Sequence, residues 1–186
     1  MYTYRITKYN PVNRDNFGKY MKDEWTSISD IGKIYEASEF TIKEYYSTES
    51  KYIDAILNFT KYLNLDKLEV TSLEKNFSYK DDVSCYEEKY KEYYTDEMEQ
   101  IFDNVCNGVY LNVHEVEVLC RLILREHIWC KLEIENVMFV HFGYDYYMYV
   151  GVYSECIGAI EEIRDSGLFV ENYESPYLVL DNSEDD

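Results

Sequence analysis

The sequence predicts an α+β domain built on an antiparallel sheet, with helices packed mainly on one face of that sheet. Short segments alternate apolar and polar residues, as half-buried strands do, and longer segments repeat apolar residues at helical spacing. The centre of the sheet is expected to be a β-hairpin over about 137–153. The 186 residues are expected to form one domain with a sizeable core.

Alternation through residues 2–7 predicts an opening strand. Residues 10–35 have no clear period and are expected to be irregular. Thr41 and Glu44 form a capping-box pattern, which predicts a helix over about 42–63 with a break near Ser47 and Thr48. A short strand is expected at 68–72.

An acidic helical insertion is expected over about 80–105, where nine carboxylates accompany three lysines. Thr95 precedes two acidic residues, so two helices are expected to meet there. Like charges at i,i+4 would each cost about 0.2–0.5 kcal/mol of helix stability. The pairs are Glu88–Glu92, Glu92–Asp96 and Glu99–Asp103.

The C-terminal half predicts a helix at 114–127, strands at 128–135 and 138–142, a helix at 155–166 and a strand at 168–170. Glu117, Arg121 and Arg125 form a charged row opposite the apolar face of the first of these helices. Gly167 should end the second helix, and the acidic tail 181–186 should be frayed. This order of elements loosely resembles a ferredoxin-like fold.

The segment HFGYDYYMYVGVY, residues 141–153, holds five tyrosines on the second half of the hairpin. Parity places Tyr146, Met148, Val150 and Val152 on the core face. The opposite face holds Asp145, Tyr147, Tyr149 and Tyr153. These side chains are either covered by another element of the chain or used to recognise a partner.

Catalytic motifs are absent: the sequence lacks glycine-rich nucleotide loops, G-x-S-x-G and H-E-x-x-H. His114 and Glu117 could share a metal, although a capping role for His114 is preferred; His127 is expected to be structural. His141 with Asp145 leaves open a small hydrolase or nuclease. No cofactor or metal is expected.

Five widely spaced cysteines without a C-x-x-C pair indicate reduced thiols and a cytoplasmic location. No apolar run approaches the length of a membrane span, and the N-terminus lacks a signal-peptide pattern.

The formal net charge of −19 disfavours direct binding to nucleic acid or to anionic membranes. Residues 1–35 hold six basic and four acidic side chains, a net charge of +2, so the remainder holds −21. General acidity of a cytosolic protein is one explanation, and a basic protein partner is the other. In the second case an acidic set would steer the partner, and Tyr147, Tyr149 and Tyr153 would anchor it. The acidic set is Glu88, Glu92, Asp96, Glu97, Glu99 and Asp103.

In composition and in its acidic and tyrosine-rich segments, the chain resembles small acidic inhibitor proteins of bacteria and phages. One group comprises immunity proteins that neutralise secreted toxins, and the other comprises DNA-mimicking anti-restriction or anti-CRISPR proteins. The resemblance implies a non-catalytic inhibitor of a basic partner, in particular an immunity protein for a nuclease-type toxin. The alternative is an antagonist, encoded by a phage or mobile element, of a nucleic-acid-binding defence enzyme.

Overall fold

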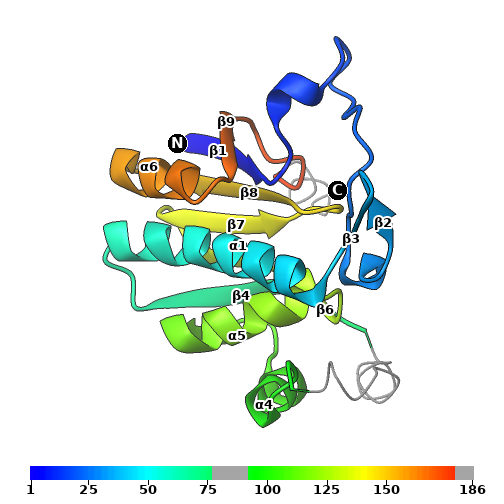
Figure 1. Ribbon diagram of the computed structural model, residues 1–186. Helices are drawn as coiled ribbons and strands as arrows, with labels where there is room; N and C mark the ends of the chain where they lie inside the picture. Colours follow the sequence, from blue (N-terminus) through cyan, green and yellow to red (C-terminus); the bar gives the residue numbers. More distant parts are fainter. Residues whose placement is uncertain (77–91, 179–186) are drawn as a thin grey trace, which may run out of the picture.

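The computed structural model describes residues 1–76 and 92–178 (Figure 1). The helices are α1 (Ile42–Tyr62), α4 (Asp96–Asn104), α5 (Val113–Leu124) and α6 (Ile157–Asp165). The main strands are β1 (Tyr2–Thr7), β4 (Lys67–Lys75), β5 (Tyr110–Asn112), β6 (Ile128–Ile134), β7 (Met138–Phe142), β8 (Tyr147–Val152) and β9 (Phe169–Asn172). Two 3-10 turns (Pro11–Asn13 and Ile28–Asp30) and a small hairpin of β2 (Ile34–Tyr35) and β3 (Ser38–Glu39) lie between β1 and α1. The predicted α+β class is confirmed.

The seven main strands form one antiparallel sheet in the order β5-β4-β6-β7-β8-β1-β9. The predicted hairpin, β7 with β8, lies at its centre. Both β8 and β9 run antiparallel to β1, which lies between them, so β8-α6-β9 is a split β-α-β unit. The same relation holds for β5-α5-β6 around β4. The ferredoxin-like resemblance is therefore limited to such split units, because the sheet extends beyond four strands.

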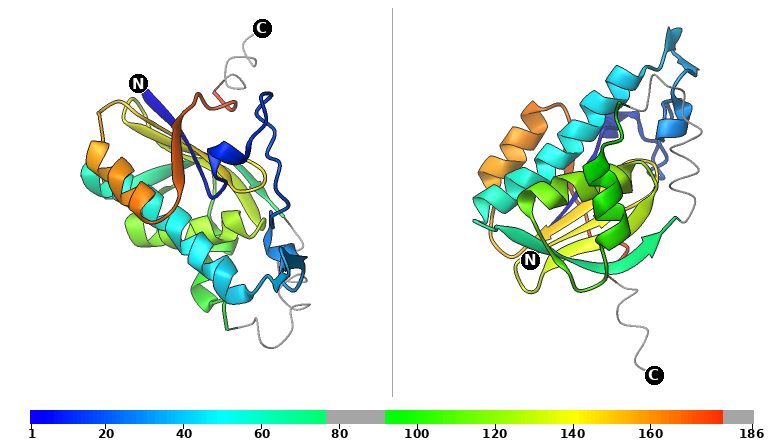
Figure 2. Two further views of the ribbon diagram at one scale, coloured as in Figure 1. Left: turned by 45° about the horizontal axis from the view of Figure 1, so that its top comes forward. Right: turned by 90° about the horizontal axis from the view of Figure 1, so that it is seen from below.

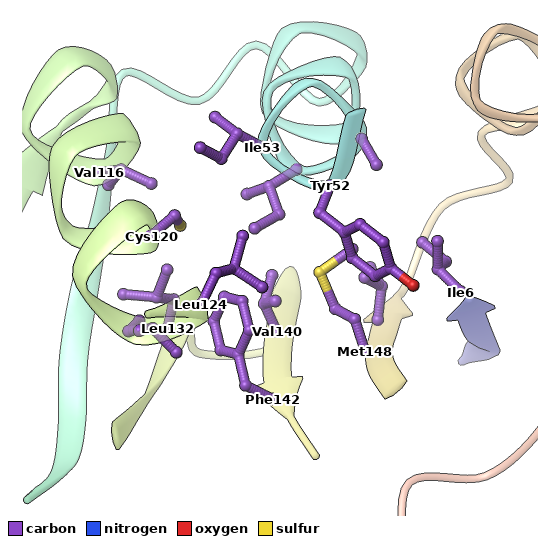
Figure 3. Close-up of a cluster of buried hydrophobic side chains, with 14 of the residues drawn as sticks. Ile6, Tyr52, Ile53, Val116, Cys120, Leu124, Leu132, Val140, Phe142 and Met148 are labelled. Carbon is purple, nitrogen blue, oxygen red and sulfur yellow. The ribbon is translucent and has the colours of Figure 1, made fainter. Parts of the chain in front are cut away.

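Helices α1, α5 and α6 lie side by side on one face of the sheet, as Figures 1 and 2 show. Their apolar stripes meet the core-facing side chains of the strands. Figure 3 shows this layer, in which Tyr52 and Ile53 of α1 lie above Val140 and Met148 of the central hairpin. Burying this apolar surface is the main contribution to the stability of the fold.

Irregular chain, rather than a helix, covers much of the opposite sheet face. Ser175 and Tyr177 of the C-terminal segment lie over β7 and β8, where Tyr177 contacts the rings of His141 and Tyr149. From the N-terminal side, the ring of Tyr9 lies 5.5 Å from that of Tyr147. Tyr147 and Tyr149 are thus part of a second packed layer.

Several predicted boundaries are corrected. Helix α1 is continuous through Ser47 and Thr48, because a buried face runs from Tyr45 to Phe59 without interruption. Helix α5 ends at Leu124, and Glu126 takes a positive φ of 66°. Helix α6 begins at Ile157 rather than at 155, and Gly167 follows it with the expected left-handed φ of 92°.

The sequence favoured a turn at Gly143 and Tyr144 with the second strand at 145–153, but the turn of the structure is longer. Asp145 and Tyr146 both have positive φ, so β8 begins only at Tyr147. Tyr146 nevertheless points into the core, with 6% of its surface exposed, as parity predicted. The predicted frayed tail, 181–186, lies outside the described residues.

Candidate partner-binding surface

Helix α4 places a row of carboxylates on the outside of the molecule. The Thr95 hydroxyl accepts a hydrogen bond from the Met98 amide, which fixes the start of the helix as predicted. Met98 and Phe102 are buried, whereas Asp96, Glu99 and Asp103 are exposed. The sequence forms an amphipathic helix whose apolar side packs on the body, so its acidic side faces solvent.

The structure separates the predicted acidic set into several environments. A carboxylate oxygen of Glu97 lies 2.7 Å from Nε2 of His114, so this side chain contacts α5 and is less available to a partner. Glu92 precedes the helix, and the predicted helical pair Glu92–Asp96 is therefore wrong, because Thr95 is the N-cap. Glu88, and with it the pair Glu88–Glu92, lies outside the described residues.

A buried arginine fixes the chain that leads into α4. Arg125 donates to the carbonyl oxygen of Tyr93 at 2.7 Å, to the hydroxyl of Tyr46 at 2.7 Å, and to both carboxylate oxygens of Glu49 at 2.7 and 2.8 Å. Only 2% of Arg125 is exposed. The predicted charged row of α5 therefore faces α1 rather than solvent, although the pair Arg121–Glu117 forms at 2.9 Å as its spacing indicates.

The three predicted tyrosine anchors differ in accessibility. Tyr149 is 9% exposed, and the rings of Tyr173 and Tyr177 lie against it. Tyr147 is half-buried beneath Tyr9, and Tyr153 is 52% exposed. Other segments of the chain therefore pack around Tyr147 and Tyr149. Parity alone could not reveal this packing.

The two residues of the alternative catalytic hypothesis lie in different environments. His141 is 1% exposed, stacks on Phe139 with a centroid distance of 4.3 Å, and lies with Nδ1 2.8 Å from Oγ of Ser175. Asp145 lies in the exposed hairpin turn. Access of a substrate to His141 would require displacement of the C-terminal segment.

The histidines and cysteines considered in the sequence have defined surroundings in the structure. Within residues 1–76 and 92–178, no group of three or more potential ligands is placed to hold a metal ion. Asn112, not His114, caps α5, since its side chain accepts from the amides of His114 and Glu115. Burial raises the pKa of the Cys120 thiol, and it raises that of Cys130 to about 12.

A cavity of about 630 Å³ opens where β4 ends, β6 begins and the β7–β8 hairpin turns. Buried Leu124 and Met148 line its interior, and the exposed residues Glu126 and Asp145 lie at its mouth. His127 lines the same cavity, and its Nε2 lies 3.1 Å from the hydroxyl of Tyr94, just before α4. The cavity and the acidic helix are therefore neighbours, a relation that sequence reasoning missed.

Comparison of the chain with protein-family models, with curated proteins and with solved structures found no match. In the part of the chain that the structure describes, none of the helices combines the length and the apolar character needed to cross a membrane.

Proposed function

We propose that this protein is a non-catalytic inhibitor that binds a basic protein and neutralises it. The observation that supports the proposal is the exposed acidic side of α4. The buried Arg125 binds the chain just before this helix, at the carbonyl oxygen of Tyr93. A fixed row of carboxylates attracts a cationic surface over about a Debye length and speeds its association.

Among basic proteins, nucleases and other nucleic-acid-binding enzymes are the proposed targets. Their active sites are lined by cations that bind phosphates, and carboxylates of Asp96, Glu99 and Asp103 would occupy the same positions. In particular, we propose an immunity protein for a nuclease-type bacterial toxin, acting in the cytoplasm. The second candidate, supported by the same acidic surface, is an anti-defence protein of a phage or mobile element.

The aromatic part of the interface is assigned to exposed rings. Tyr144, in the turn of the hairpin, and Tyr153, at the opposite end of β8, are 88% and 52% exposed and are available to a partner. Tyr147 and Tyr149 contribute indirectly, because their packing stabilises this face of the sheet. This division follows from burial, because a ring covered by its own chain has little surface left to bury on binding.

Affinity capture from the native host, followed by mass spectrometry, tests the proposal. A basic nuclease should be captured, and its activity on DNA or RNA should fall when the purified protein is added. A toxin gene beside this gene would support the immunity role. Hydrolysis of RNA, DNA or simple esters by the protein itself, abolished by His141→Ala, would overturn the proposal in favour of an enzyme.

A further inference from the structure

The cavity at the strand ends combines an apolar interior with a negatively charged mouth. Its interior is lined by the buried side chains of Ile123, Leu124 and Met148. Aromatic walls come from Trp129, Tyr144 and Tyr177. At about 630 Å³, the space falls in the range of about 300–1,000 Å³ of small-ligand sites and is ample for one large side chain.

Three carboxylates, those of Glu74, Glu126 and Asp145, surround the exposed part of the cavity. The one lysine among the described lining residues, Lys75, directs its ammonium group to the carbonyl oxygen of Phe102 in α4, at 2.5 Å. Among the described lining residues three carboxylates therefore outnumber one ammonium group, which gives this part of the mouth a negative charge. Burial, and next the nearby charges of Asp145 and Asp30, raise the pKa of the Glu126 carboxyl, consistent with that charge.

We infer that the cavity receives an apolar side chain of the basic partner, with an adjacent lysine or arginine of that partner at the mouth. This inference rests on the proposed function. An apolar group would displace water from the interior, and its cation would meet the carboxylates and the faces of the aromatic walls. The bond between Tyr94 and His127 joins the cavity to the base of α4, so one partner can reach both.

Three small probes that share a phenyl ring test the chemistry of the cavity without any partner. They are 2-phenylethylamine (cationic), 2-phenylethanol (neutral) and 3-phenylpropanoate (anionic). The chain has two tryptophans, so a ¹H–¹⁵N spectrum has two indole signals, and Trp129→Phe assigns them. The amine should shift the Trp129 signal and bind at least about fivefold more tightly than the anion, as expected for paired charges near a surface.

Two double variants distinguish the effect of the carboxylates at the mouth from the effect of the protein's net charge. Glu126→Gln with Asp145→Asn removes two of the three carboxylates and should greatly reduce the preference for the amine. The control, Glu161→Gln with Asp165→Asn on α6, changes the net charge equally at exposed positions and should retain that preference. Absence of any Trp129 shift with millimolar amine, or equal binding of the anion, would overturn the inference.

The nature of the occupant is tested with the captured partner. Saturating 2-phenylethylamine should weaken the complex, and the Glu126→Gln/Asp145→Asn variant should also bind the partner less tightly. A complex indifferent to both changes would contradict the inference about the cavity, while the proposed inhibitor function would stand. Failure to capture any basic protein would instead contradict the proposed function, whatever the probes show.

Discussion

Glu49 of α1 and Arg125 at the end of α5 form a bidentate ion pair inside the protein. Nε and Nη2 of the guanidinium donate to the two carboxylate oxygens at 2.7 and 2.8 Å, and neither side chain is more than 1% exposed. Because Arg125 also binds the carbonyl oxygen of Tyr93, this pair connects the helical layer to the chain that precedes α4. The position of the acidic helix thus depends on a charge buried in the core.

Removal of one partner of this pair should strongly destabilise the fold. Glu49→Ala leaves the guanidinium of Arg125 buried without its counterion, which typically costs about 3–5 kcal/mol. Urea denaturation measures the change. Glu117→Ala, at the half-exposed partner of Arg121, should cost less than about 1 kcal/mol. Equal losses in the two variants would show that burial of the first pair is not decisive.

Lys8 should make stability depend on pH between about 8 and 10. Burial lowers the pKa of its ammonium group from 10.5 to about 8, despite the nearby carboxylate of Glu24. In this window the unfolded chain holds the Lys8 proton and the folded chain does not, so the contribution of Lys8 to stability should rise with pH, by about 3 kcal/mol over the full shift. The buried thiols of Cys120 and Cys130 keep their protons in the folded chain and contribute in the opposite direction. The stability of the wild type relative to Lys8→Met should therefore rise between about pH 8 and 10, whereas its stability relative to the exposed control Lys43→Met should not change with pH.

Buried tyrosines should determine how stability depends on pH above about pH 10. Burial raises the pKa of Tyr45 and Tyr52 above 10, so above that pH the unfolded chain loses protons that the folded chain retains. Stability should therefore fall at strongly alkaline pH. A continued rise above pH 10 would contradict the burial of these hydroxyl groups.

The hairpin tyrosines should separate into a structural and an accessible group. Tyr149→Ala should cost about 3–5 kcal/mol of unfolding free energy, because the ring fills the layer beneath Tyr173 and Tyr177. Tyr153→Ala should change stability by less than about 0.5 kcal/mol and act on partner affinity instead. Thermal unfolding and a binding assay together measure both effects, and a stable Tyr149→Ala protein would refute the packed-layer description.

A larger residue at Gly151 should destabilise the fold while Phe139 faces it across the hairpin. The two residues are cross-strand neighbours, and a Cβ at Gly151 would overlap the phenyl ring. Gly151→Ala should cost about 1–3 kcal/mol through overpacking. Adding Phe139→Leu should recover part of that loss; strictly additive losses in a double-mutant cycle would contradict the contact.

Much of the fold follows from local pattern. Alternation predicted β1 and β6, the Thr41–Glu44 box predicted the start of α1, and Gly167 predicted the end of α6. These signals act over a few residues, through side-chain direction and capping, so they can be read without knowing the tertiary structure.

The second layer and the cavity could not be predicted in this way. Tyr177 reaches β8 from an irregular segment, and such segments have no period that indicates which face they cover. The spacing of Arg125 predicts an exposed charged row, and only the packing of α1 brings Glu49 opposite it. The cavity combines residues of β4, β6, β7 and β8 with residues of α1, α5 and the C-terminal segment, so only the assembled fold defines it.

The salt dependence of association with the captured partner tests the central claim most directly. The wild-type rate constant should fall steeply between low and physiological ionic strength. Asp96→Asn with Glu99→Gln on α4 should slow association and flatten this dependence, whereas the charge-matched control Glu161→Gln with Asp165→Asn on α6 should have a smaller effect. An association rate indifferent to ionic strength, or equal effects of the two double variants, would contradict steering by the acidic helix.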